Sequence, residues 1–408
     1  MRLPILAGLL ALAAAAGFAQ RPSFTLNAET PEGQILQAAA MEEDEAKKLA
    51  LYESFLKQHP AHEYAWWAWA QAQNLYLKGE NYDKVIEAAV AVLEKDPMNS
   101  PVAYNALQAA EKKKDYEAAL EPLGQARWYN TLGYLHFLKG EIEPARAAYE
   151  AALAITQALE HHYLLLDSAA YLSQISIMAG QLNAGREWCD SLLARYSQPI
   201  APLCVLLLPL AQIVYEQGEI ERGQTLLQDA IRLAREGSIP DLLWSAYLLL
   251  ALVEAANGRV GDAEAALQTA AGVIKGFQSP VMLSMLNAAR ARVLLADRRL
   301  DEAAEWAESY REIGAVSFLR AFEDLTLARV WIALGETDQA LALLADFARA
   351  AQSDGRVDHV IQAQVLTALA LQAAGKPDSA AQALDLALRL ALPERWVRTF
   401  ADHGAALQ

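Results

Sequence analysis

The chain has 408 residues, of which 54% are apolar, and its formal net charge is −16. Such an acidic surface repels nucleic acid and anionic lipid, and no basic stripe offsets it, so we expect no nucleic-acid partner. Alanine and leucine are abundant, and runs of alternating β-branched residues are absent. This composition predicts an all-α protein with essentially no strands.

The first 19 residues have the layout of a cleavable secretory signal. Arg2 supplies a positive charge, Leu3 to Ala16 form an apolar run, and small residues flank Phe18 before Gln20. We therefore expect residues 1–19 to be a signal peptide and the mature chain to be periplasmic or secreted, with no membrane insertion after cleavage. The alternative is an apolar helix that starts the folded body of a cytoplasmic protein.

Later apolar runs are too short or too interrupted to span a membrane. The run 199–214 is broken by Pro202, Pro209 and Gln212, and the run 242–256 is short and carries Glu254. Both are interpreted as buried helices.

The N-terminal part of the mature chain changes character twice. Residues 20–45 are polar and acidic, which indicates a loose leader, and residues 46–58 form a single helix that caps the repeats behind it. The next stretch follows the 34-residue tetratricopeptide pattern in order and spacing. The matching positions are Trp69, Ala72, Tyr76, Gly79, Tyr82, Val85, Ala89, Val92 and Pro97. Residues 46–127 are therefore interpreted as N-terminal tetratricopeptide repeats with a capping helix.

Pairs of residues, mostly small, spaced twelve apart recur along the chain, and each pair brackets a turn. Small residues at the same level of two helices let the helices approach closely. The pairs are Gln73/Val85, Leu107/Ala119, Gly133/Ala145, Ser173/Gly185, Ala211/Gly223, Ala251/Ala263, Ala291/Ala303, Ala328/Ala340 and Ala368/Ala380. This register predicts a right-handed α-solenoid of about nine tetratricopeptide-like helix pairs.

The weakest interface of the array is expected between the second unit, which contains Ala119, and the third, which contains Ala145. Pro122 and Gly124 interrupt the second helix of the second unit, and the next unit follows almost at once. We therefore expect limited proteolysis to cut first between Glu121 and Arg127.

Three stretches have a recognisable pattern: the turn at 215–221, the string at 289–296, and the final repeat with its exit, from Leu366 to Phe400. Through them, residues 128–400 resemble the helical sensor region of MalT-like, LuxR-type transcriptional activators, and residues 401–408 form a tail. It implies a sensor that binds a small sugar on this region. Such activators also carry a phosphate-binding loop and a helix-turn-helix, and neither motif occurs here. A secretory signal is also out of place on such a sensor, so the chain could also be a composite joined near Trp128.

Polar and aromatic residues recur on the first helix of successive units, on the face away from the packing pairs. Curvature is expected to turn that face into a concave wall. The predicted wall residues are Asn74, Asn130, Tyr134, Tyr171, Gln212, Tyr215, Arg292 and Arg329. Tyrosines and amides suit oligosaccharide or peptide backbone, and arginines favour a carboxylate on the ligand. The alternative is a solvated wall without a ligand.

No acid, base and nucleophile converge in the sequence, so we predict no enzyme, no metal and no cofactor. His161 and His162 are adjacent and face different directions on a helix. Whether Cys189 and Cys204 pair is left open, because the geometric window for a disulfide is narrow.

The sequence favours a non-enzymatic scaffold that binds a protein or peptide segment in its groove. The alternative is a small-ligand sensor, with an oligosaccharide-like ligand, that lacks nucleotide-binding and DNA-binding modules.

Overall fold

The computed structural model describes residues 30–93, 122–275, 279–310 and 320–403, together with Val102, Asn105, Ala106, Ala109 and Lys112. Within these residues every regular element is a helix and no strand occurs. The expected signal peptide, residues 1–19, lies outside the described residues.

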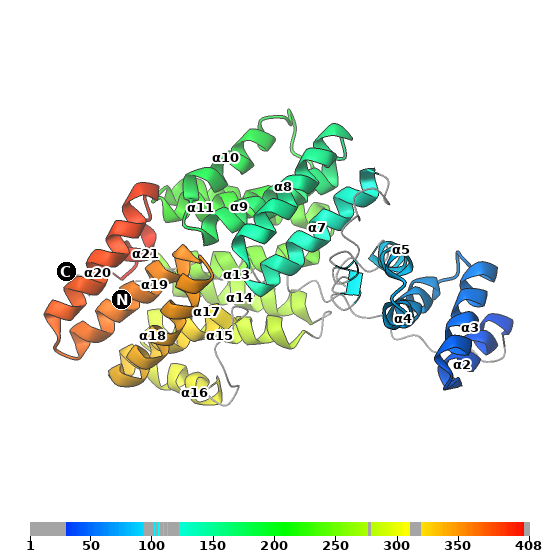
Figure 1. Ribbon diagram of the computed structural model, residues 1–408. Coiled ribbons are helices and arrows are strands. Elements are labelled where there is room, and N and C mark those ends of the chain that lie inside the picture. The colour runs from blue at the N-terminus through cyan, green and yellow to red at the C-terminus, as the bar shows by residue number, and fades with distance from the viewer. Residues whose placement is uncertain are drawn as a thin grey trace.

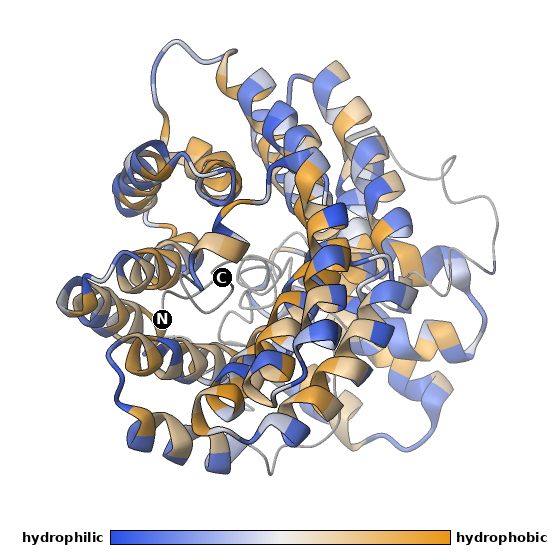
Figure 2. Ribbon diagram, turned by 90° about the vertical axis from the view of Figure 1, so that its left-hand side faces the viewer, coloured by the Kyte–Doolittle hydropathy of each residue, from blue (hydrophilic) through white to orange (hydrophobic). Residues whose placement is uncertain are grey.

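The described helices pair antiparallel in chain order, and the pairs stack side by side into a curved solenoid (Figure 1). The pairs are α2 (Pro31–Met41) with α3 (Glu45–Gln58), α4 (Ala65–Lys78) with α5 (Tyr82–Leu93), α7 (Pro122–Lys139) with α8 (Ile142–Ala158), α9 (His162–Met178) with α10 (Leu182–Leu193), α11 (Cys204–Glu216) with α12 (Ile220–Glu236), α13 (Pro240–Ala256) with α14 (Val260–Ile274), α15 (Pro280–Ala296) with α16 (Leu300–Tyr310), α17 (Ala321–Leu334) with α18 (Thr337–Ser353), and α19 (Val357–Ala373) with α20 (Pro377–Ala391). Hydrophobic residues gather where helices meet, and hydrophilic residues lie mainly on the outer helices (Figure 2).

The twelve-residue register is confirmed for every pair except Leu107/Ala119, which lies outside the described residues. Ala340 has no exposed surface, and Ser173 Oγ donates to the carbonyl of Gly185 at 2.9 Å. A Cβ added to Gly185 would lie 3.0 Å from the Ser173 carbonyl oxygen. The two helices of a unit therefore touch at these positions, which is why the residues are small.

Each turn within a unit has its left-handed residue at the same place, seven positions after the first member of the packing pair. Their φ angles lie between 54° and 87°, at Glu80, Gly140, Gly180, Gly218, Gly258, Arg298, Gly335 and Gly375. Glycine adopts this conformation without a Cβ penalty, which explains the glycine turns in the sequence. Glu80 and Arg298 are the departures among the described units.

Placing glycine at this turn position should stabilise the fold, and replacing glycine there should destabilise it. Arg298→Gly should raise the free energy of unfolding by up to about 1 kcal/mol, because it relieves a left-handed residue. Gly258→Ala should lower it by about 1 kcal/mol, and no atom lies within 4 Å of the new Cβ, so the change acts through the backbone alone. Urea melts measure both changes, and two shifts of the same sign would contradict the shared turn geometry.

Ala340→Leu should lower the free energy of unfolding by about 1 to 3 kcal/mol through overpacking. Ala340 is completely buried in the core between α16, α17 and α18. Ala342→Leu is the matched control, because Ala342 is exposed on the same helix. Equal urea midpoints for the two variants would show that the packing register is wrong.

The loose leader expected over residues 20–45 is wrong for residues 31–41, which form helix α2. Thr30 caps this helix by accepting a hydrogen bond from the Gly33 amide at 3.1 Å, and Pro31 occupies a favourable position in the first turn. Leu36 and Ala39 are buried against α3, the predicted capping helix. The N-terminal part therefore begins with a helix pair rather than with a lone helix.

Trp66, Trp67 and Trp69 lie on α4 and pack, partly buried, against the core of the N-terminal part. Trp67 meets the ring of Tyr52 edge to face at 5.9 Å. These tryptophans therefore contribute to packing.

Pro122 does not interrupt a helix, as the sequence led us to expect. It begins α7, which continues through Gly124 to Lys139. Proline suits the first turn of a helix, where its missing N–H would have no intrahelical partner. The predicted early cleavage between Glu121 and Arg127 therefore loses its basis, because most of that segment is helical.

The two apolar runs form the buried helices α11 and α13, as predicted. Among the described helices, none combines the length and apolar character that crossing a membrane requires.

Cys189 and Cys204 are buried and free. Burial raises the pKa of each thiol to about 12, so neither is a reactive thiolate near neutral pH.

The curvature brings the last residues of the chain back onto the middle units. We call residues 392–403, with η5 (Leu392–Glu394) and α21 (Arg398–Ala401), the C-terminal clamp. The Trp396 indole N–H donates to the carbonyl of Gly180 at 3.3 Å, and the Val397 amide donates to the carbonyl of Glu216 at 2.8 Å. These contacts join the two ends of one superhelical turn.

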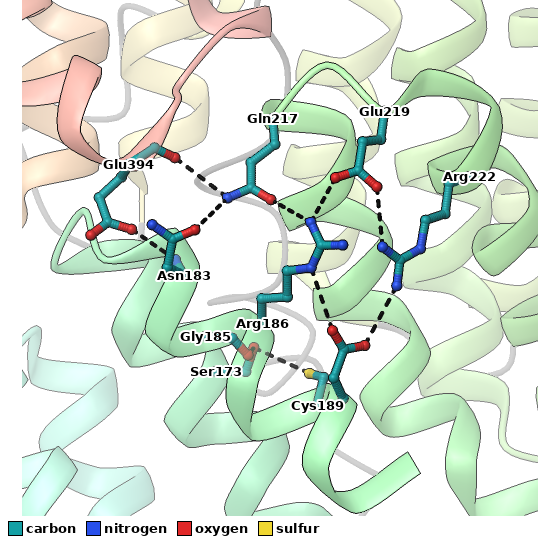
Figure 3. Close-up of polar contacts among 10 residues, drawn as sticks. Ser173, Asn183, Gly185, Arg186, Cys189, Gln217, Glu219, Arg222 and Glu394 are labelled. Carbon is teal, nitrogen blue, oxygen red and sulfur yellow. Dashed lines mark hydrogen bonds and ion pairs between the residues drawn. The ribbon is translucent and has the colours of Figure 1, made fainter. Parts of the chain in front are cut away.

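Polar contacts at the surface support the same closure (Figure 3). Glu394 accepts a hydrogen bond from the Asn183 amide at 2.7 Å, and its carbonyl accepts one from Gln217 at 3.4 Å. Arg186 donates to both Gln217 and Glu219, at 2.9 and 2.6 Å. Clamp, α10 and the turn after α11 thus form one network.

Candidate functional site

The described structure contains an open pocket of about 250 Å³ between helices α5, α7 and α9. We call it the α7–α9 pocket. Its wall comes from the inner faces of the first helices of two successive units and from α5 of the N-terminal part. The lining residues are Ala89, Val90, Gly124, Arg127, Trp128, Asn130, Thr131, Tyr134, His161, Tyr163, Leu164, Asp167 and Tyr171.

A cluster of aromatic rings forms one side of the pocket. Tyr171 stacks on Tyr149 with ring centroids 4.7 Å apart and planes at 7°. Tyr134 and Phe137 meet Tyr171 edge to face, at 5.9 and 5.4 Å. These contacts fix the Tyr171 ring in one orientation, so the pocket wall is formed before any ligand arrives.

A carboxyl and an amide that line the pocket are hydrogen-bonded to each other. Asn130 donates from one nitrogen to Asp167 at 3.0 Å and to Ser168 at 3.2 Å. Burial raises the pKa of Asp167 to about 6, and the hydrogen bond from Asn130 opposes that rise. Asp167 is therefore mostly ionised at neutral pH.

The pocket brings together three of the predicted wall residues: Asn130, Tyr134 and Tyr171. Asn130 and Tyr171 are half-buried, and Tyr134 is 8% exposed. These residues belong to adjacent first helices, α7 and α9, as the sequence register requires.

Four of the other five predicted wall residues are buried, so the expectation that they line an open wall is wrong. The fifth, Asn74 on α4, is exposed but does not line the pocket. Gln212 and Tyr215 lie on α11, Arg292 on α15 and Arg329 on α17, and none is more than 2% exposed. Gln212 lies one turn before Glu216 on α11, the helix that the clamp covers. Tyr215 donates from its hydroxyl to Asp402 of the clamp at 3.1 Å.

The clamp residues contact both Tyr215 and Glu216 of α11. The Arg398 guanidinium lies over the Tyr215 ring at 5.0 Å and pairs with Asp402. Thr399 donates to Glu216 through its amide at 3.0 Å and its hydroxyl at 2.9 Å. This inner face of α11 is therefore occupied by the chain itself.

The two inward arginines lie deeper in the same interior. Arg292 donates to Thr326 at 3.1 Å and lies over the Phe322 ring at 4.5 Å. Arg329 contacts His403 at 3.3 Å. Burial lowers the pKa of Arg292 to about 9 and that of Arg329 well below its usual value, and neither side chain is open to a ligand in this conformation.

Sequence reasoning did not assign two acids, Asp167 and Asp241, to this site, for different reasons. Asp167 precedes Tyr171 by one helical turn, so the i, i+4 spacing could have placed it on the same face. Asp241 lies at the start of α13. Its charge, like that of Asp167, raises the pKa of Tyr134, Tyr163 and Tyr171. No local pattern links Asp241 to α7 or α9.

His161 lines the pocket and caps α9 by accepting a hydrogen bond from the Leu164 amide at 3.4 Å. Its neighbour His162 contacts the Tyr196 hydroxyl at 3.0 Å. Within the described residues no group of three His, Cys, Asp or Glu side chains could hold a metal ion.

The stacked pairs, the twelve-residue contacts and the left-handed turns define a tetratricopeptide-like α-solenoid. A family model described as the MalT-like TPR region matches residues 122–408. The chain therefore belongs to the MalT-like TPR family, as the sequence resemblance predicted. No curated protein matches the chain.

Solved structures with this fold cover nearly the whole chain. A Rap protein complexed with competence and sporulation factor is 14% identical, with a TM-score of 0.59, and the match covers 89% of this chain and 97% of that one. The apo form of RapI is 13% identical, with a TM-score of 0.47 and coverages of 89% and 96%. At 14% identity the likeness to the complexed Rap protein concerns the fold alone, and it agrees with the predicted α-solenoid.

Proposed function

We propose that this protein is a non-enzymatic interaction scaffold that binds a peptide segment of a partner protein, with the α7–α9 pocket as the anchor point. The observation that carries this proposal is the open pocket itself, which combines fixed tyrosine faces with the polar groups of Asn130 and Asp167. Repeat solenoids present many side chains on a rigid curved surface, which suits an extended or helical peptide.

Binding to an array of random dodecapeptides, followed by fluorescence anisotropy on the selected peptides, tests this proposal. Combining Asn130→Ala with Tyr163→Ala should weaken binding at least about tenfold, because an aromatic face and a hydrogen-bonding amide are removed together. Tyr163 is 62% exposed, so the helical circular dichroism should not change. Tyr196→Ala, outside the pocket, is the matched control, and equal affinities for all three proteins would refute the proposal.

The second candidate is a small-ligand sensor, which the MalT-like family match favours. Tyrosine faces and amides also suit a sugar ring. A panel of short oligosaccharides titrated by calorimetry separates the two functions. Saturable heat with a sugar that is lost in the Asn130→Ala, Tyr163→Ala protein, without any peptide binding, would establish the sensor instead.

We also propose that the protein is exported from the cytoplasm, on the basis of its first 19 residues alone. Expression in a Gram-negative host should yield periplasmic protein that begins at Gln20, because the small residues before it suit signal peptidase. N-terminal sequencing of the mature protein measures this. Full-length cytoplasmic protein that retains Met1 would contradict export.

A further inference from the structure

The α7–α9 pocket is lined by the carboxylate of Asp167. Asp167 accepts its hydrogen bond from the neutral amide of Asn130, and Asp241 Oδ1 has no hydrogen-bond partner within the described part of the chain. Arg127 also lines the pocket.

Three tyrosine rings line the pocket together with Asp167, and Asp241, which is not a lining residue, acts on them through its charge. Tyr134, Tyr163 and Tyr171 each have a raised pKa, and both carboxyls contribute to the rise in all three cases. The rings of Tyr134 and Tyr171 are 5.9 Å apart, and that of Tyr163 is mostly exposed. A cation is attracted both by the faces of aromatic rings and by carboxylates.

The size of the pocket limits what can enter. At about 250 Å³, it lies below the range of roughly 300 to 1,000 Å³ that holds a drug-sized ligand. One long side chain is a better match than a whole oligosaccharide. Because the pocket opens between α5, α7 and α9, the rest of a bound peptide would continue outside it.

We infer that the α7–α9 pocket binds the cationic side chain of an arginine or a lysine in the partner peptide. The aromatic faces contact the stem and the charged head, and the Asp167 carboxylate accepts a hydrogen bond from the head. This inference rests on the proposed peptide-binding function and names the residue type that the site selects. The acidic surface of the whole protein, at −16, favours the approach of such peptides.

A double-mutant cycle tests the inference with the selected dodecapeptides. Each arginine of a bound peptide is replaced in turn by citrulline, and each lysine by acetyl-lysine, which preserve the shape but remove the charge. One replacement should weaken binding to the parent protein about tenfold or more. On Asp167→Asn the same replacement should change affinity less than about twofold, because the charge partner is already gone. Asp346→Asn, an exposed residue on α18, is the matched control and should behave like the parent.

The outcomes separate this inference from the proposed function. If no peptide binds, or if Asn130→Ala with Tyr163→Ala has no effect, the proposed function fails. If peptides bind through the pocket but citrulline and acetyl-lysine are tolerated, the cationic specificity alone is overturned. Selected peptides that contain no arginine or lysine would overturn it as well.

Discussion

Replacing Trp396 by alanine should lower the free energy of unfolding by about 3 to 5 kcal/mol, the usual range for a buried tryptophan. Trp396 is 4% exposed and packs with Ile177, Ile213 and Ile361, which belong to helices at opposite ends of the superhelical turn. The substitution leaves a cavity in that contact and removes the hydrogen bond to the Gly180 carbonyl. Urea melts followed by circular dichroism measure the loss.

Trp306→Ala is the control for this prediction. Trp306 is half-buried on α16 and stacks on Tyr310, so its loss should be smaller. Hydrogen exchange on Trp396→Ala should also show faster exchange at Gly180 and Val397, which the clamp joins to the body. A cost below about 1 kcal/mol would show that the clamp does not pack on the middle units.

The stability of the protein should fall as the pH rises, and Glu216 should account for a large part of that fall. Burial raises the pKa of Glu216 from an ordinary value of 4.5 to about 8, Asp402 adds to the rise, and Thr399 opposes it. The folded protein therefore holds this proton more tightly than the unfolded chain does. The resulting stabilisation is complete below pH 4.5 and is lost as the pH rises through 8.

Comparison with Glu216→Gln isolates this carboxyl, because both proteins share the other titrating groups. Between pH 5.5 and 8.5, the parent should lose roughly 3 kcal/mol more of its free energy of unfolding than Glu216→Gln. Glu305→Gln, exposed on α16, should follow the parent. Parallel pH profiles for the parent and Glu216→Gln would contradict the buried, protonated state.

Local spacing was sufficient to predict the repeat architecture. Ser173 contacts Gly185, and Ala328 and Ala340 are buried, because in each unit two helices are joined by a short turn. A stretch of about twelve residues is therefore enough to predict this packing. The same local logic placed Asn130, Tyr134 and Tyr171 on one face, and the structure brings them to one pocket.

Superhelical curvature could not be predicted in this way. Tyr215 and Asp402 are 187 residues apart, yet they form a hydrogen bond. Their proximity depends on small rotations that accumulate from unit to unit, and no single turn encodes them. Counting positions on α11 therefore identified the inward face correctly but not the clamp that covers it.

The most direct test of the central claim is hydrogen exchange of the protein with and without a saturating selected dodecapeptide. A peptide anchored in the α7–α9 pocket should slow exchange in α7 and α9, around Asn130 and Asp167, and leave α15 and α17 unchanged. Protection confined to the outer helices, or to the interior around Arg292 and Arg329, would contradict the pocket as the binding site.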